Sequence, residues 1–307
     1  MASLRDLKSR ISSVQNTQQL TAAMKMVAAA KLRRAQEGIF STRPYAFKLS
    51  GIIARLKRQL DPSLHPLFHQ RDVVSDVLLI VVTADRGLAG GFNSNVIKKA
   101  EQTIEELYAQ HHSEGRLHLL CVGKKGHEHF SRRGYKLVGD FRGTFDKLSF
   151  QKADQIASVA EDGFVDGQWD EVFVIYNEFK NTISQNRVVE PFIPIRSHRF
   201  LTPIMESELA HLDDEDHQFE NDLIYEPGVA GILDILVPRF LNYKIWRVLL
   251  DSNAAEQGAR MVAMDNATTN ADELLKDLKL KYNRARQDAI TKELIEITSG
   301  ADALEAG

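Results

Sequence analysis

Long helical segments at both ends of the chain constrain its fold more than any other feature of the sequence. In residues 3–60, and again from about residue 227 to the end, apolar residues recur at alternating steps of three and four. This spacing places them on one face of a helix, as in a coiled coil. At 1.5 Å per residue the first helix would be roughly 80 Å long and the second more than about 100 Å, which exceeds the helices of ordinary globular domains. We therefore expect the two helices to bury their apolar faces against each other as an antiparallel coiled coil.

The apolar positions shift from one helical face to another along each segment, and such shifts locally unwind a supercoil. We call the apolar residues expected to face the other helix the seam. In the N-terminal segment the expected seam comprises Leu4, Leu7, Ile11, Val14, Leu20, Met24, Val27, Leu49, Ile52, Ile53 and Leu56. In the C-terminal segment it comprises Leu241, Ile245, Val248, Ser252, Ala255, Ala259, Val262, Ala271, Leu275, Leu278, Tyr282, Ala285 and Ala289, followed by Ile290, Leu294, Ile297 and Ala301. Pro238 is expected to kink this helix or to mark its first turn.

Between the two helices, short apolar runs alternate with helical segments. Strands are expected at residues 77–84, 117–122 and 172–176, and helices at 95–111, 125–133 and 150–162. This order predicts a small Rossmann-like α/β domain with a mainly parallel sheet, to which residues 182–194 would add an edge strand. The expected parts are an N-terminal coiled-coil helix at residues 1–60, the α/β domain at 72–205, an acidic linker at 206–226 and a C-terminal coiled-coil helix at 227–307.

Charge is distributed unevenly. Twelve Lys or Arg residues lie between residues 5 and 58, against two acidic residues. Residues 200–238 contain no Lys or Arg and include four consecutive acidic residues at 213–216. A basic helix of this kind can bind nucleic acid, an anionic membrane or an acidic protein. The net charge of the whole chain is only −3, which disfavours a surface built to hold nucleic acid.

A glycine-rich turn at residues 85–93 is the strongest candidate for a chemical site. It follows an expected strand and opens a helix, which is where α/β domains often bind phosphate. Its spacing matches neither the dinucleotide-binding fingerprint nor the P-loop. We therefore favour a structural turn, in which Asp85 and Arg86 tie the backbone to a neighbour and Gly87, Gly90 and Gly91 allow it to bend.

The remaining candidates are weaker. His127 and His129 are two residues apart, a spacing that does not bring side chains together on a helix, and the same holds for His111 and His112. Cys121 is the only cysteine and lies in an apolar strand, where it is expected to pack rather than react. The sequence therefore predicts no catalytic, cofactor-binding or metal site. The longest apolar run, residues 77–82, is much shorter than the ~20 residues that cross a bilayer, so no membrane span is expected.

Four motifs together resemble the gamma subunit family of F-type ATP synthases: residues 14–31, 85–93, 259–268, and 282–293 with 299–301. The resemblance covers nearly the whole chain. It implies a non-catalytic central rotor shaft, whose terminal helices pass through a hexamer of alpha and beta subunits and whose α/β domain lies near the epsilon subunit and the c ring. Its rotation would transmit torque and so couple proton translocation to ATP synthesis or hydrolysis. ATP, ADP and Mg would be bound by the alpha and beta subunits, not by this chain.

The resemblance also implies roles for single residues. Met24 and Lys25 match family positions near the rotor contact with beta, and Arg286 and Gln287 match positions that touch loops of beta. Thr291 and Glu293 belong to the same family signature. The implied location is peripheral, on the cytoplasmic face of the bacterial plasma membrane.

Two other classes of protein remain open on the residues alone. One is a nucleotide-using α/β enzyme with helical arms, and the other is a basic coiled-coil protein that binds nucleic acid. The acidic residues 213–222 are more charged than the corresponding link of the family, and a solvated linker is the hypothesis for them.

Overall fold

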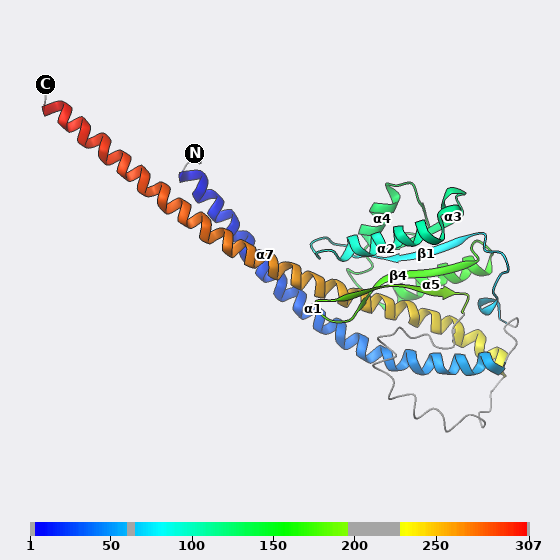
Figure 1. Cartoon of the computed structure of the whole chain (residues 1–307). Coiled ribbons are helices and arrows are strands. Elements are labelled where there is room, and N and C mark those ends of the chain that lie inside the picture. Colours follow the sequence, from blue (N-terminus) through cyan, green and yellow to red (C-terminus); the bar gives the residue numbers. More distant parts are fainter. Residues whose placement is uncertain (1–3, 60–64, 196–227, 306–307) are drawn as a thin grey trace. The chain divides into compact units, whose positions relative to one another are not determined.

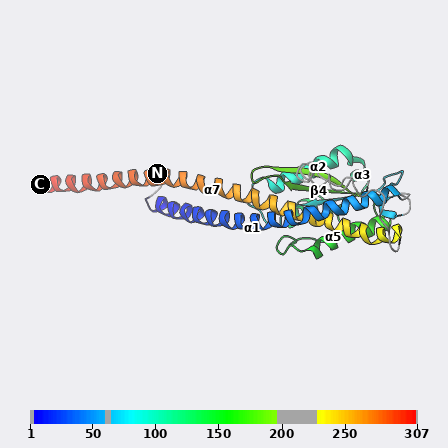
Figure 2. The same ribbon diagram turned by 90° about the horizontal axis from the view of Figure 1, so that it is seen from below.

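The computed structural model describes residues 4–59, 65–195 and 228–305. Two long helices, α1 (Leu4–Gln59) and α7 (Val229–Glu305), are continuous throughout these bounds (Figures 1 and 2). Each contributes to two compact units, one formed by residues 1–28 and 261–307 and the other by residues 29–260. Pro238 lies inside α7 and not in its first turn. The expected acidic linker at 206–226 lies outside the described residues, as do the side chains of Leu56 and Ala301.

In the unit of residues 29–260, a five-stranded sheet has the order β3-β2-β1-β4-β5. The strands are β1 (Val77–Val82), β2 (Leu117–Val122), β3 (Lys136–Leu137), β4 (Glu171–Phe179) and β5 (Gln185–Ile193). Only the β4–β5 pair is antiparallel, and β5 lies at the edge. The connecting helices are η2 (Pro66–Phe68), α2 (Phe92–Leu107), α3 (Ala109–Ser113), α4 (Lys124–Ser131) and α5 (Phe150–Val165). The mainly parallel sheet and the edge strand are confirmed, whereas the two-residue β3 has no equivalent among the expected strands.

The central strand β1 is buried on both faces, as the continuous apolar run predicts. Leu78, Ile80 and Val82 belong to one core cluster, and Val77, Leu79 and Val81 belong to another, because side chains alternate along a strand. On the second face lie α2 and Phe130 of α4. On the first face lie α5, α7 and the C-terminal part of α1, represented by Ile156, Leu241, Ile245, Leu49 and Ile53. The long helices therefore form part of the core of the α/β unit.

In the unit of residues 1–28 and 261–307, α1 and α7 pair in antiparallel directions, as predicted (Figures 1 and 2). Gln18 Nε2 donates to Asp272 Oδ1 at 2.6 Å, the hydroxyls of Thr21 and Thr268 lie 2.8 Å apart, and Lys25 Nζ lies 2.6 Å from Asp265 Oδ1. Residue numbers rise along one helix as they fall along the other. This pairing is therefore carried partly by polar side chains.

Part of the expected N-terminal seam is wrong. Leu20 and Val27 are 61% and 56% exposed, whereas Thr21 and Ala28 are buried. The contact stripe runs through Thr21, which a search for apolar residues overlooks, and through Ala28, whose alanine-rich stretch is expected to allow a partner helix to approach closely. Since successive helical residues point about 100° apart, a stripe displaced by one residue leaves its apolar neighbours in solvent. Ile52, further along α1, is also largely exposed.

The seam of α7 is buried only in part. Leu275 and Leu278 are buried, while Ile290, Leu294 and Ile297 are exposed. The reason is the length of the partner helix: α1 begins at Leu4, and the pairing of Gln18 with Asp272 brings Leu4 opposite about residue 286. The C-terminal end of α7 extends past the N-terminal end of α1 (Figure 1). Among residues 4–59, 65–195 and 228–305, no helix therefore lies opposite the last part of the expected seam.

Candidate functional site

The carboxylate of Asp85 ties the glycine-rich turn to two neighbouring segments. Asp85 accepts hydrogen bonds from the backbone N–H groups of Lys124 at 2.9 Å, Gly143 at 2.7 Å and Phe145 at 2.8 Å. It thereby connects the loop after β1 to the start of α4 and to the loop before α5. Gly90 has a φ of 55°, in the left-handed region that glycine adopts without strain.

Arg86 contributes less to this turn. Its Nη2 lies 3.1 Å from Asp146 Oδ1, but the two side chains are 76% and 58% exposed, and exposed ion pairs of this kind contribute little stability. The structure places Gly87, Gly90 and Gly91 in the turn, with Gly91 preceding α2 as its N-cap.

Side chains from both long helices cover this turn. Ala84, Ala89 and Phe92 pack in one cluster with residues of α1 and α7, which are Leu32, Ala35, Ile39, Leu250, Ala254 and Ala255. Arg260 of α7 donates from Nη1 to the carbonyl oxygen of Gly87 at 2.6 Å, and its Nη2 lies 2.5 Å from Glu256 Oε1. In open α/β sheets, ligands bind in the crevice outside the carboxyl ends of the strands. Here the end of β1 is a packing surface for the long helices.

A second connection between the sheet and α7 is ionic and buried. Glu190 of β5 forms two ion pairs with α7. Its Oε1 lies 3.1 Å from Lys244 Nζ, and its Oε2 lies 2.7 Å from Arg247 Nη2. Tyr176 of β4 donates its hydroxyl to Glu190 Oε2 at 3.1 Å. The side chains of Glu190, Lys244 and Arg247 are 12%, 5% and 4% exposed. We call Glu190, Lys244 and Arg247 the buried charge cluster.

Electrostatics favour the charged form of the glutamate. Burial raises the pKa of Glu190, but the charges of Arg247 and Lys244 and their hydrogen bonds outweigh it and lower the pKa to about 2. Burial lowers the pKa of Lys244, and Glu190 offsets only part of that effect. Burial also acts to lower the pKa of Arg247, but Glu190 outweighs it and the pKa is raised.

Sequence analysis did not single out this cluster. A signal was present, because Lys244 and Arg247 interrupt an apolar stretch of the C-terminal helix and are three residues apart, which puts both on one helical face. Their common partner, Glu190, is more than fifty residues away in sequence and has no pattern that points to it.

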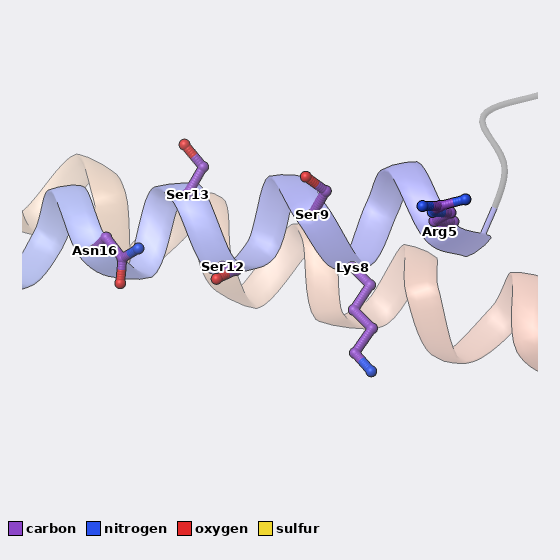
Figure 3. A pocket seen from close by; sticks show the side chains of 6 residues that line it. All are labelled: Arg5, Lys8, Ser9, Ser12, Ser13 and Asn16. Carbon is purple, nitrogen blue, oxygen red and sulfur yellow. The ribbon is translucent and has the colours of Figure 1, made fainter.

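The residues proposed for partner contacts lie on the long helices. Met24 is half-buried, and Lys25 forms the ion pair with Asp265. Arg286, Gln287, Thr291 and Glu293 are exposed on α7. A polar hollow of about 510 Å³ on the first turns of α1 is lined by Arg5, Lys8, Ser9, Ser12, Ser13 and Asn16 (Figure 3).

The histidines and the cysteine have local packing roles. His129 Nε2 lies 2.8 Å from Glu101 Oε1, and His111 Nε2 lies 3.2 Å from the carbonyl oxygen of Val74. Burial raises the pKa of the Cys121 thiol to about 12. Across residues 4–59, 65–195 and 228–305, no group of three or more His, Cys, Asp or Glu side chains is placed to hold a metal ion. In the same ranges, no helix combines the length and apolar character needed to cross a membrane.

Comparison with known proteins gives a consistent result. A family model described as ATP synthase matches residues 3–304. The ATP synthase gamma chain of Salinibacter ruber is 58% identical over 305 residues, which cover 99% of each protein. That of Chlorobaculum tepidum is 48% identical over 305 residues, which cover 99% of this chain and 100% of that one.

Solved structures share the fold. A chain of the Euglena gracilis mitochondrial ATP synthase, from a structure of OSCP, F1 and the c-ring, aligns with a TM-score of 0.61 and 18% identity, covering 99% of this chain and 95% of that one. A chain of the Tetrahymena thermophila mitochondrial ATP synthase central stalk and c-ring aligns with a TM-score of 0.56 and 23% identity, covering 81% of this chain and 99% of that one. From the full-length family match and the identity to its curated members, the chain belongs to the ATP synthase gamma chain family.

Proposed function

We propose that this chain is the central rotor shaft of an F-type ATP synthase and that it transmits torque between a proton-driven c ring and catalytic sites on beta subunits. The observation that carries the proposal is the full-length match to gamma chains. The antiparallel pair of α1 and α7 supports it, because two paired helices bury their common face and resist bending better than one. Both solved structures described above include a c-ring, which supports the c ring as a partner.

The unit of residues 1–28 and 261–307 is the part that we propose to enter a hexamer of alpha and beta subunits. Ile290, Leu294 and Ile297 are exposed there, and apolar residues of this kind gain free energy when a partner covers them. Arg286, Gln287, Thr291 and Glu293 are exposed polar groups for contacts with beta. Met24 and Lys25 would contact beta from α1. Rotation changes catalytic sites only if these contacts differ between their open and closed states.

Catalysis, in this proposal, belongs to the partner subunits. Ala84, Ala89 and Phe92 of the turn after β1 pack against Leu32, Leu250 and Ala254 of the long helices, and this packing role supports the assignment of ATP, ADP and Mg to the alpha and beta subunits. The epsilon subunit and the c ring would contact the unit of residues 29–260. The complex would lie on the cytoplasmic face of a bacterial plasma membrane, with this chain peripheral to it.

Reconstitution tests the proposal directly. ATP turnover is measured for this chain alone, for alpha plus beta, and for all three after size-exclusion separation. The shaft function predicts a chain that is inert alone, elutes with the hexamer and changes its turnover. Hydrolysis of ATP by the chain alone, or failure to join the hexamer, would refute the proposal and return the turn at residues 85–93 to consideration as a nucleotide site.

A further inference from the structure

The buried charge cluster occupies a particular mechanical position. Glu190 is on the edge strand β5, which is joined to the sheet only through β4. Lys244 and Arg247 are on α7, and both form ion pairs with the carboxylate of Glu190. Lys244 Nζ also donates to the carbonyl oxygen of Pro191 at 2.5 Å. One side chain and one adjacent backbone group of the sheet edge are thus bound to one face of the long helix.

This kind of contact resists rotation in a way that apolar packing does not. Dispersion and hydrophobic contacts are non-directional, so a helix can turn slightly against an apolar surface at small cost. Charge-assisted hydrogen bonds are short and directional, and breaking one in a buried site leaves a charge without its partner. A twist of α7 about its own axis would move Lys244 and Arg247 away from Glu190 together.

Surrounding aromatic rings confine the cluster further. Lys244 Nζ lies 5.8 Å from the centre of the Phe192 ring, and Arg247 Cζ lies 5.9 Å from the centre of the Tyr176 ring. Asp251, buried one helical turn after Arg247, also raises the pKa of that arginine, so Arg247 has a second negative charge nearby. Aromatic rings therefore flank the cluster, and Asp251 together with Glu190 balances the charges of Lys244 and Arg247.

We propose that the Glu190–Lys244–Arg247 cluster is the torsional joint of the rotor: it fixes the rotation of α7 relative to the sheet and transmits torque between them. This inference rests on the proposed function, since torque matters only in a rotating subunit. Buried ion pairs often contribute little net stability compared with apolar residues of similar volume. A torsional function accounts for a charged contact at this position, where apolar packing would serve stability equally well.

The test uses the complete ATP synthase complex in inverted membrane vesicles. The variant is Glu190→Leu with Lys244→Met, which removes one charge of each sign and leaves Arg247 beside Asp251. ATP hydrolysis and ATP-driven proton uptake are measured on the same vesicles. We expect the protons pumped per ATP hydrolysed to fall at least twofold, while hydrolysis continues, because the joint slips under load.

A matched control separates slippage from general destabilisation. Arg71 and Asp170 form another ion pair of low exposure in the same unit, but it connects the segment before β1 to the start of β4 and does not involve α7. Arg71→Met with Asp170→Asn also removes one charge of each sign and should leave the pumping ratio unchanged. An equal fall in this control would contradict the inference, as would an unchanged ratio in the Glu190→Leu, Lys244→Met complex.

Two further variants cover failure of assembly and failure of the proposed function. Arg247→Lys keeps every charge but loses the planar guanidinium, so it should lower the ratio less than Glu190→Leu with Lys244→Met does. If the double variant does not assemble, Lys244→Met alone removes the 3.1 Å contact with Glu190 and the hydrogen bond to Pro191, and it should lower the ratio by a smaller factor; an unchanged ratio would overturn the inference. If the wild-type chain itself does not support proton pumping, the proposed rotor function fails. If only the cluster variants keep a normal ratio, the rotor function stands and the torsional joint alone is refuted.

Discussion

At the scale of single residues, Glu161 is half-buried on α5, and its Oε1 atom is enclosed without a hydrogen-bond partner in the described part of the chain. Burial and, to a smaller extent, the neighbouring charges of Asp162 and Asp154 together raise its pKa to about 8. In the unfolded chain the pKa of this carboxyl lies near its ordinary value of 4.5. Between these two values the folded state holds a proton that the unfolded state has lost, so the free energy of unfolding falls as pH rises.

Glu161→Gln should remove this pH dependence. The variant should be more stable than the wild type above pH 8, by on the order of 2 kcal/mol, because one pKa unit corresponds to about 1.4 kcal/mol and local relaxation reduces the full effect. The two proteins should have similar stability near pH 4.5. Urea unfolding at a series of pH values measures the difference. Glu106→Gln, at an exposed position of α2, is the control and should show no pH-dependent gain; an equal gain in both variants would refute the explanation.

Gly163 on α5 is required by its close approach to an indole ring. A Cβ atom there would lie 2.0 Å from Cζ2 of Trp169, which is fixed by a hydrogen bond from its Nε1 to the carbonyl oxygen of Ala160. Gly163→Ala should therefore destabilise the chain by about 1–3 kcal/mol, as overpacking does in other cores. Thermal unfolding measures the effect. Gly87→Ala, where a Cβ atom meets nothing within 4 Å, should be nearly neutral; a smaller loss at Gly163 than at Gly87 would contradict this reading.

At the scale of elements, the pairing of α1 with α7 can be tested by a cross-link. The side-chain oxygens of Thr21 and Thr268 lie 2.8 Å apart in the unit of residues 1–28 and 261–307. Thr21→Cys together with Thr268→Cys should form a disulfide under mild oxidation, visible as a mobility shift that a reductant reverses. Cys121 should not compete, because burial raises the pKa of its thiol to about 12.

The matched control for this cross-link places the first cysteine on another face of α1. Ala23→Cys with Thr268→Cys should remain reduced under the same conditions, since Ala23 is exposed. Efficient cross-linking of the control, or none in the Thr21 pair, would show that the register of the two helices is wrong.

The existence and order of the longer elements could be predicted from the sequence, because they depend on local periodicity, whereas the short η2 and β3 could not. The continuous apolar run of β1 and the stepwise pattern from Leu241 to Val248 are signals of this kind. The register between α1 and α7 could not be predicted, because its contact residues include Gln18 and Thr21, which apolar periodicity does not mark.

Less of the candidate site than of the fold could be predicted from the sequence. The role of Asp85 in tying the glycine-rich turn to a neighbouring segment could be predicted, and the hydrogen bond from the backbone N–H of Lys124 confirms it. Its hydrogen-bond partners, such as Gly143 and Phe145, could not, since they depend on where a distant loop packs. The pairing of Glu190 with Arg247 is likewise a tertiary contact without a local signal.

At the scale of the whole molecule, exposed apolar residues near the end of α7 separate assembly from folding. Leu294 and Ile297 are 58% and 68% exposed, so Leu294→Gln with Ile297→Gln should change the melting temperature of the isolated chain little. If a hexamer covers them, the same variant should bind alpha and beta subunits at least tenfold more weakly in a pull-down titration. Leu275→Gln, at a buried position, should instead lower the melting temperature of the isolated chain. Unchanged binding of the double variant would exclude these residues from the interface.

Rotation is the central claim, and its direct observation is the most decisive measurement. Gln102→Cys provides a labelling site on the exposed surface of α2, while Cys121 stays protected by burial. A complex of this chain with alpha and beta subunits is fixed to a surface through beta, and a gold particle is attached to the introduced thiol. The account predicts stepwise rotation in one direction on addition of ATP, at a rate that follows ATP turnover. Continued turnover with a stationary or randomly fluctuating particle would contradict it.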